Sequence, residues 1–449
     1  MDDFLFNEFS TVSPAAWKQK IQVDLKGADY NDSLIWKSNE GIHVKPFYTS
    51  EDRHNNNVCL PKDGYKICQS IFVDDVIIAN KIAVDSLERG ATAIQFIAKN
   101  TFDYIVLFDK IDTKKTHIYL NFEFLDAAFI SEIEKYCKGN YIYFQIDIIG
   151  NLAKTGNWFS NLNADISEKA KFIDTVTNSI CVDASLYQNA GATIIQELAY
   201  ALAHTNEYLE LFGESIALKI HYIFSIGSNY FFEIAKLRAF RILVEVLFKE
   251  RGIQHTTIHI FTKPSLRNKT IFDYNVNMLR TTSECMSAIL GGSDTISNIS
   301  YDSIYHKSNE FGERIARNQL LILKEEAYLS EAHKFANGAY YIENTEKQFA
   351  EKALQLFKQI EKNGGFLKQL KKGTIQNKIN ENAGKQQELF DQNKLILLGT
   401  NKLPSQNDRM KNELQIYPFL KKKNSKTLIV PILQRRLSEQ HEQNRLKME

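Results

Sequence analysis

The chain has 449 residues, of which 44% are hydrophobic and 24% charged, a composition typical of a water-soluble globular protein. The formal net charge is +1, so bulk electrostatics favour neither nucleic acid nor an acidic membrane surface as a partner. The first residues are acidic, and no uncharged apolar run approaches the roughly 18 residues of a membrane span, so we expect neither a secretory signal nor a transmembrane helix. The cysteines are scattered without a Cys-x-x-Cys pair, which is typical of reduced thiols, and we expect a cytoplasmic protein. They are Cys59, Cys68, Cys137, Cys181 and Cys285.

The first 60 residues precede the repeating part of the sequence. Turn signals occur at Lys26-Gly27 and Lys45-Pro46, and a polar run over 52–57 is typical of a loop. We therefore expect residues 1–60 to form an N-terminal extension.

Residues 61–335 alternate short apolar runs with longer amphipathic segments. Eight runs rich in Ile, Val, Phe and Tyr are strand candidates. They cover 67–73, 92–98, 117–124, 142–149, 178–185, 220–227, 256–262 and 295–301. Helical patterns are clearest over 191–212, 229–250, 272–290 and 308–329. This alternation predicts a parallel sheet and, at this length, an α/β fold with a closed eight-stranded β/α (TIM-type) barrel.

A ninth strand candidate competes for the eight places. The run 104–110 (YIVLFDK) is as apolar as the others. An open, doubly wound sheet is therefore the alternative to the barrel.

The composition changes after residue 335. Segments 343–363 and 367–397 are rich in Lys, Glu and Gln and are separated by Gly364-Gly365, which predicts a helical extension over 336–403 that completes the barrel domain. Residues 404–449 form a basic tail with Lys421-Lys422-Lys423 and Arg435-Arg436. Such charged runs favour a solvated surface, and packing against a partner subunit is the alternative.

Motifs of catalysis and metal binding are not evident. The chain lacks a phosphate-binding loop, a His-Glu-x-x-His pair and a Gly-x-Ser-x-Gly turn. His255 and His259 share a strand face but are too far apart to chelate one ion, so we interpret their spacing as chance. Asp147, Asp183 and Glu197 lie where barrel enzymes carry catalytic groups, but acidic residues also cap helices there, and capping is the favoured interpretation.

An ordered series of motifs resembles the methylmalonyl-CoA mutase family. The motifs are 23–30 (VDLKGADY), 41–48 (GIHVKPFY), 189–193 (NAGAT), 196–199 (QELA), 232–241 (FEIAKLRAFR), 277–282 (NMLRTT), 314–319 (RIARNQ) and 399–402 (GTNK). They keep the family's order across residues 17–403, and 232–241 is the most specific. The resemblance implies a β/α barrel and a radical rearrangement of (R)-methylmalonyl-CoA to succinyl-CoA, started by homolysis of the cobalt–carbon bond of adenosylcobalamin.

The sequence departs from the family where catalysis takes place. Catalytic members carry Tyr-His-Met-Gln-Glu where this chain has residues 185–189 (SLYQN), so Leu186 stands at the position of the histidine that binds the thioester carbonyl and offers no donor. Residues 261–263 (FTK) replace the family's His-Ser-Gln. We therefore expect no catalytic, cofactor-binding or metal-binding residue in this chain. The degenerate positions are Ser185, Leu186, Tyr187, Gln188, Phe261 and Lys263.

The family's cobalt-ligating motif, Asp-x-His-x-x-Gly, also lacks a counterpart after the barrel. The partial match Asp52-Arg53-His54 has no following glycine and precedes the barrel. The segment 404–449 is shorter than the roughly 100 residues of a doubly wound domain. We expect no cobalamin-binding domain in this chain.

The resemblance thus implies a small, non-catalytic subunit of a heterodimeric methylmalonyl-CoA mutase. The large subunit is expected to hold adenosylcobalamin and substrate, and to contact the extension 1–60, barrel helices and the basic tail. Two alternatives remain: a self-sufficient acyl-CoA mutase barrel served by a separate cobalamin protein, and a non-enzymatic CoA-binding barrel. The leading hypothesis predicts weak or no acyl-CoA binding by this chain, and no binding to nucleic acid or membrane.

Overall fold

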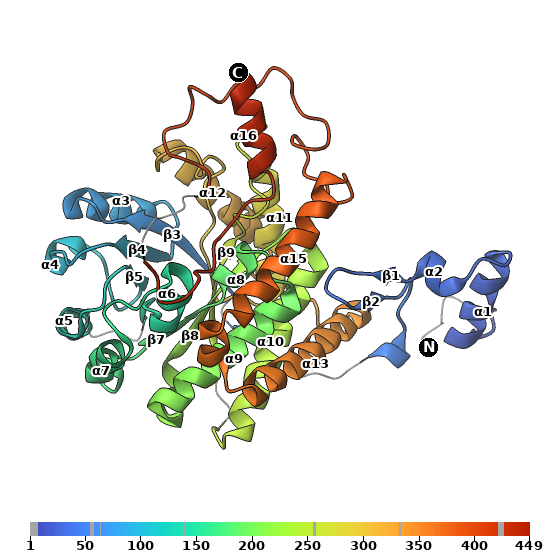
Figure 1. Cartoon of the computed structure of the whole chain (residues 1–449), viewed down its shortest axis with the longest axis horizontal. Helices are drawn as coiled ribbons and strands as arrows, with labels where there is room; N and C mark the ends of the chain where they lie inside the picture. Colours follow the sequence, from blue (N-terminus) through green and yellow to red (C-terminus); the bar gives the residue numbers. More distant parts are fainter. Residues whose placement is uncertain are drawn as a thin grey trace.

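The barrel is present in the computed structural model, which describes residues 8–53, 58–62, 64–137, 141–254, 257–331, 334–420 and 426–449. Eight parallel strands follow the order β6-β5-β4-β3-β10-β9-β8-β7, with helices around them (Figure 1). They are β3 (Lys66–Phe72), β4 (Ala93–Ala98), β5 (His117–Phe122), β6 (Ile142–Phe144), β7 (Ile180–Asp183), β8 (Ile220–Ile226), β9 (His259–Pro264) and β10 (Thr295–Ile296). A parallel bridge from Tyr143 to Asn178 links β6 to the segment before β7 and nearly closes the sheet. The predicted TIM-type barrel is confirmed, and the open sheet is wrong.

The helices of the barrel follow the predicted alternation, with one correction. They are α3 (Val76–Glu88), α4 (Tyr104–Leu107), α5 (Ala127–Cys137), α6 (Ile148–Thr155), α7 (Leu162–Ile173), α8 (Ser185–Asn189), α9 (Ile194–Phe212), α10 (Tyr230–Glu250), α11 (Val276–Leu290) and α12 (Glu310–Leu321), which a π-helical turn, η3 (Ile322–Glu326), continues. A 3-10 segment, η2 (Glu214–Lys219), precedes β8. The run 104–110 is not a strand, because Asp103 accepts hydrogen bonds from the amides of Ile105 and Val106 and starts α4 there.

Aromatic side chains fill the middle of the barrel. Alternate strand residues point inward and form a buried cluster. Its members are Cys68, Ala93, Tyr119, Tyr143, Cys181, Ile223 and Phe261. The Tyr119 ring lies 4.8 Å from that of Tyr143 and 4.6 Å from that of Phe261, between ring centroids. The barrel axis at this level is therefore packed side chain.

The predicted C-terminal helices pack on the outside of the barrel. α13 (Tyr340–Lys362) and α14 (Phe366–Lys371) are separated by Gly364-Gly365 as predicted, and both glycines have positive φ. The segment predicted as one helix over 367–397 is instead α14 and α15 (Thr374–Asp391), because Gly373 is left-handed at φ 77°. A buried ion pair of 2.5 Å between Arg238 and Glu346 joins α10 to α13. The motif 232–241 thus contributes helix packing and salt bridges.

The N-terminal residues form an arm at one side of the barrel (Figure 1). It contains α1 (Pro14–Asp24), α2 (Tyr30–Leu34), a hairpin of β1 (Trp36–Lys37) and β2 (His43–Val44), and the short turn η1 (Ser50–Asp52). The hairpin docks on the barrel, since Ile42 is 1% exposed in the main core. Helix α1 has no buried residue.

The tail crosses the carboxyl end of the barrel before ending in α16 (Glu439–Met448). We call residues 426–438 the strap. Five strap amides donate to barrel carbonyls at 2.7–3.2 Å. Leu428 and Ile429 bond to Gly156, Ile432 to Ala153, Arg435 to Asn189 and Leu437 to Arg267.

The expectation of a solvated charged tail is wrong for one of its arginines. Arg436 is 6% exposed and forms an ion pair of 2.7 Å with Glu442, because the strap turns it under α16. Arg435 is exposed, and Lys421–Lys423 lie outside the described residues.

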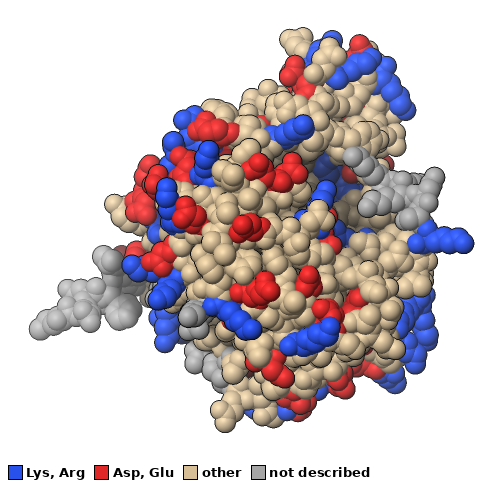
Figure 2. Space-filling view, turned by 90° about the vertical axis from the view of Figure 1, so that its left-hand side faces the viewer, with Lys and Arg blue, Asp and Glu red and all other residues tan. Residues whose placement is uncertain are grey.

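The visible outer surface carries mixed charge. Figure 2 shows Lys and Arg interspersed with Asp and Glu on the side that bears α3, α4 and α5. Among the described residues, every helix is too short or too polar to cross a lipid bilayer.

Candidate functional site

The carboxyl end of a β/α barrel is where barrel enzymes bind and transform their substrates. In this chain a cavity of about 270 Å³ lies there, between the ends of β5 to β8 and Gln434 of the strap. Its lining includes Gln145, Asp183 and Leu186. We call it the mouth cavity.

Leu186 is placed in the mouth cavity by the turn after β7. The Ser185 hydroxyl and amide both donate to Oδ1 of Asp183, at 2.5 and 3.1 Å, and so fix the start of α8. Leu186 is 3% exposed. An isobutyl group therefore stands at the position where the family resemblance implies a hydrogen-bond donor.

The neighbouring positions point elsewhere. The Tyr187 hydroxyl lies 3.0 Å from Nδ1 of His204 in the outer core. Gln188 accepts a hydrogen bond of 2.8 Å from Ser265 and lines a separate cavity. The six positions predicted as degenerate thus divide between the mouth, the barrel axis and the core behind the helices.

A directed chain of polar side chains leads from Lys263 to the mouth cavity. The Lys263 ammonium donates to Oε1 of Gln95 at 2.8 Å, and Nε2 of Gln95 donates to Oε1 of Gln145. An ammonium group can only donate, so Oε1 of Gln95 faces Lys263 and Nε2 of Gln95 faces Oε1 of Gln145. Nε2 of Gln145 is then the last group of this polar chain. That nitrogen is buried without a hydrogen-bond partner in the described part of the chain. Burial lowers the pKa of Lys263.

Gln95 and Gln145 were not predicted as site residues. Each occupies a position in or at the end of an otherwise apolar strand candidate, and each is at most 5% exposed. A buried glutamine in such a strand indicates an inward-facing polar site, but only if the inward face is known. The sequence alone does not identify that face.

Asp147 is a structural residue, as the capping interpretation predicts. Its Oδ1 accepts from the Gly150 amide at 2.7 Å and from the Tyr208 hydroxyl at 2.6 Å. Nε2 of His204 lies 3.1 Å from the same oxygen, and the Asp183 amide donates to Oδ2 at 2.9 Å. Burial by itself would raise the pKa of Asp147, but His204 and these donors outweigh it and the pKa is lowered. Both carboxylate oxygens of Asp147 are therefore occupied by contacts that stabilise the fold.

Asp183 and Glu197 behave differently from each other. Asp183 caps the turn into α8, and burial raises its pKa. Glu197 does not cap α9, because Thr193 and Gln196 form the capping box there. Glu197 instead pairs with Lys236 at 2.9 Å, away from the mouth cavity.

Phe261 and His259 lie inside the barrel. Phe261 is fully buried against Tyr119, and Nε2 of His259 lies 2.8 Å from the Tyr119 hydroxyl. His255 and His54 lie outside the described residues. Within the described ranges, no group of three or more His, Cys, Asp or Glu side chains is arranged to hold a metal ion.

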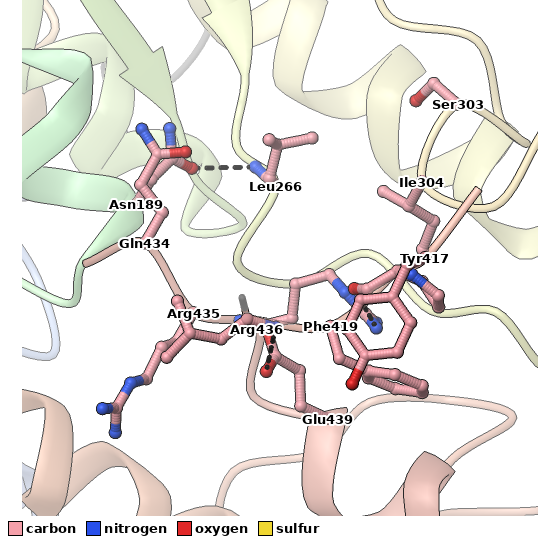
Figure 3. Close-up of a pocket in the computed structure, with 12 residues that line it drawn as sticks. Asn189, Leu266, Ser303, Ile304, Tyr417, Phe419, Gln434, Arg435, Arg436 and Glu439 are labelled. Carbon is pink, nitrogen blue, oxygen red and sulfur yellow. Dashed lines mark hydrogen bonds between the residues drawn. The ribbon is translucent and has the colours of Figure 1, made fainter. Parts of the chain in front are cut away.

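The strap encloses a second cavity, of about 250 Å³, beside the mouth (Figure 3). Figure 3 shows Asn189 accepting a hydrogen bond from the Leu266 amide above the strap residues Arg435 and Arg436. Arg436 donates to the carbonyls of Lys269 and Pro418 at 2.9 and 3.2 Å. Both cavities fall below the roughly 300–1,000 Å³ typical of sites for drug-sized ligands. The strap therefore covers the carboxyl end of the barrel and leaves only small cavities there.

Comparisons with known proteins agree with the motifs. The sequence profile of the methylmalonyl-CoA mutase family matches residues 103–448. The methylmalonyl-CoA mutase small subunit of Porphyromonas gingivalis is 34% identical over 443 residues, covering 89% of this chain and 71% of that protein. The methylmalonyl-CoA mutase of Rhizobium meliloti is 33% identical over 249 residues, covering 53% of this chain and 35% of that protein.

A third relative is more distant but aligns over most of this chain. The human mitochondrial methylmalonyl-CoA mutase is 26% identical over 460 residues, covering 86% of this chain and 60% of that protein. The chain thus spans 35% and 60% of the length of the Rhizobium meliloti and human mutases. By the profile match and the small-subunit similarity together, the chain belongs to the methylmalonyl-CoA mutase family.

Proposed function

We propose that this chain is the small, non-catalytic subunit of a heterodimeric methylmalonyl-CoA mutase. It supports a large subunit that isomerises (R)-methylmalonyl-CoA to succinyl-CoA by an adenosylcobalamin radical mechanism. The observation that carries the proposal is the closed mouth of the barrel, covered by the strap and lined by Leu186.

The interior supports the loss of activity. A thioester carbonyl at the mouth would find the isobutyl group of Leu186 and no donor from that side chain. Deeper in the barrel, the rings of Tyr119, Tyr143 and Phe261 occupy the axis. An extended acyl-CoA has no route through this packed layer without displacement of three buried aromatic side chains, each of which costs several kcal/mol to remove from a core.

The described residues do not fit a cobalamin. Its corrin ring would have to face the barrel mouth to act on a substrate there, and the strap occupies that face through five backbone hydrogen bonds. We propose that the large subunit holds the cofactor, and no step is assigned to it on this chain.

The N-terminal arm is the proposed contact with the large subunit. Trp17 and Val23 on α1 are 51% and 71% exposed, and the helix buries no residue on its own barrel. Exposed apolar side chains on a helix that does not pack on its own barrel are typical of a segment that binds a partner. We divide the chain into the arm (1–60), the degenerate barrel (61–335), the helical extension (336–403) and the tail (404–449).

The proposal is tested by purifying this chain alone and together with a mutase chain that contains Asp-x-His-x-x-Gly. We expect a one-to-one complex with mutase activity from the pair. The chain alone is expected to bind no stoichiometric cobalamin and to show weak or no acyl-CoA binding by calorimetry.

Two results would contradict it. Turnover of methylmalonyl-CoA with a separate cobalamin protein and no large subunit would make this chain a self-sufficient mutase. Tight acyl-CoA binding without turnover would make it a CoA-binding regulatory barrel.

A further inference from the structure

The hairpin of the arm places a carboxyl group on the barrel. Oε2 of Glu40, in the turn between β1 and β2, accepts a hydrogen bond of 2.5 Å from the Ile194 amide at the start of α9. Beside it, the Trp36 ring stacks on Phe232 of α10 with centroids 5.3 Å apart. These contacts and the buried Ile42 are the docking site of the hairpin.

Glu40 docks next to a buried cluster of Glu197, Glu233 and Lys236, which has more carboxyl groups than cations. The Lys236 ammonium lies 2.9 Å from Glu197 and 2.6 Å from Glu233, and all three side chains are at most 4% exposed. Lys236 thus pairs with two carboxyl groups, and the Glu40 carboxyl lines the same cavity as Glu233. Oε1 of Glu197 has no hydrogen-bond partner among the described residues.

The cavity that Glu40 and Glu233 line has a volume of about 230 Å³, and the cation Arg267 also lines it. Arg267 does not pair with the carboxyl groups of the cluster. The Arg267 guanidinium donates to Oε1 of Gln386 at 2.7 Å and to the Arg435 carbonyl at 3.0 Å. Its pKa is lowered to about 10 by burial and by Arg435, so it stays protonated at neutral pH. It is tied to α15 and the strap.

Burial favours the protonated form of two carboxyl groups of this cluster. Burial raises the pKa of Glu40 to about 7, with Glu233 adding repulsion and the Ile194 amide and Lys236 opposing it. Burial likewise raises the pKa of Glu197 to about 8. Glu197 and Glu233 lie on the long helices α9 and α10, whereas Glu40 lies in the turn of a two-stranded hairpin. Undocking of the hairpin would therefore carry the Glu40 carboxylate away from Glu197 and Glu233 and relieve their mutual repulsion when protons are lost.

We propose that Glu40 is a proton-operated latch: the arm docks on the barrel while the Glu40–Glu197–Glu233–Lys236 cluster keeps a proton, and it undocks as that proton is lost. The latch sets how tightly the hairpin is held against α9 and α10. It concerns this chain alone and does not depend on the identity of any partner.

The direction of the pH effect follows from linkage. The docked carboxyl has a pKa of about 7, above its ordinary value of 4.5, so the docked state binds more protons than the undocked state between these values. Docking is then strongest below about pH 4.5 and weakens as pH rises to about 7, up to about tenfold per pH unit for one proton.

Hydrogen exchange on the isolated chain tests the latch. Protection of the Ile194 amide and of segment 36–44 is measured by mass spectrometry between pH 5.5 and 8.5, with labelling times scaled for the intrinsic exchange rate. We expect wild-type protection to fall by at least about tenfold over this range. In Glu40→Gln, whose amide still accepts from Ile194 but cannot ionise, protection is expected to change less than about threefold.

Two further variants keep the test decisive. Glu233→Gln removes a neighbouring charge and leaves the hairpin intact, so it should also reduce the pH dependence. Glu51→Gln changes an exposed arm carboxyl outside the cluster and should behave as wild type. A wild-type profile without pH dependence, or one unchanged in both E40Q and E233Q, would overturn the latch. Neither outcome bears on mutase assembly, which is measured separately.

Discussion

At the residue scale, buried charges hold the outer helices to the barrel. Arg238 and Glu346 are both fully buried, so removing Arg238 takes away the cation that pairs with a buried carboxylate. Arg238→Met keeps most of the side-chain volume and is expected to cost about 3–5 kcal/mol in the free energy of unfolding, measured by urea denaturation. Lys378→Ala, which removes an exposed pair with Glu381, should cost less than about 1 kcal/mol. If the two variants lost the same free energy of unfolding, the buried ion pair of Arg238 would not stabilise the packing of α10 on α13.

Histidines inside the barrel make stability depend on pH. Burial lowers the pKa of His117 to about 4 and that of His221 well below its ordinary value, and neither ring nitrogen of His221 has a hydrogen-bond partner among the described residues. Between about pH 6.5 and 4 the unfolded chain therefore binds more protons than the folded chain, so stability falls as pH falls, by up to about 1.4 kcal/mol per pH unit per group. Urea midpoints at pH 7 and 5 measure this slope. His221→Leu is expected to reduce this slope. An unchanged slope in the variant would show that His221 does not contribute to the pH dependence of stability.

At the element scale, much of the fold was predictable. Seven of the eight strand candidates became strands of at least three residues because β-branched and aromatic runs suit a buried parallel sheet. The eighth, 295–301, contains only the two-residue β10. Segment 104–110 failed because one capping aspartate, Asp103, outweighs an apolar run. The strap was not predictable, since its apolar residues show no regular period and its contacts lie far away in the chain.

The strap also gives a prediction of access to the mouth cavity. Cys181 lines this cavity and is 1% exposed, while Ile432 of the strap is 3% exposed. Ile432→Asp is expected to release the strap and raise the rate at which a maleimide labels Cys181 by at least about tenfold, because a buried charge is strongly disfavoured. Val430→Asp, at a strap position that is 65% exposed, is the control and should leave the rate unchanged. Labelling of Cys181 at the same rate in all three proteins would show that the strap does not close the mouth.

At the scale of the whole molecule, the motifs predicted the family, which the comparisons confirm. The replacement of a catalytic histidine by Leu186 follows from the sequence resemblance and stays a prediction. The polar chain from Lys263 to Gln145 depends on which strand face points inward, and the covering of the mouth depends on residues about 250 positions away. Both are properties of the closed barrel and are not carried by any local segment.

The arm provides the test of assembly. Helix α1 buries no residue on its own barrel, so removing residues 1–24 should leave the thermal midpoint of the isolated chain within about 2 °C of wild type, because the barrel core is untouched. The same deletion is expected to weaken association with the large subunit by at least about a hundredfold, as the exposed Trp17 and Val23 side chains are lost from the contact. The double variant Trp17→Asp and Val23→Asp should reproduce the loss without shortening the chain, whereas Leu218→Asp, on η2 before β8 and 73% exposed, should not. Association is measured by analytical ultracentrifugation of the mixed subunits. Full association of the truncated chain would place the partner contact elsewhere on the barrel.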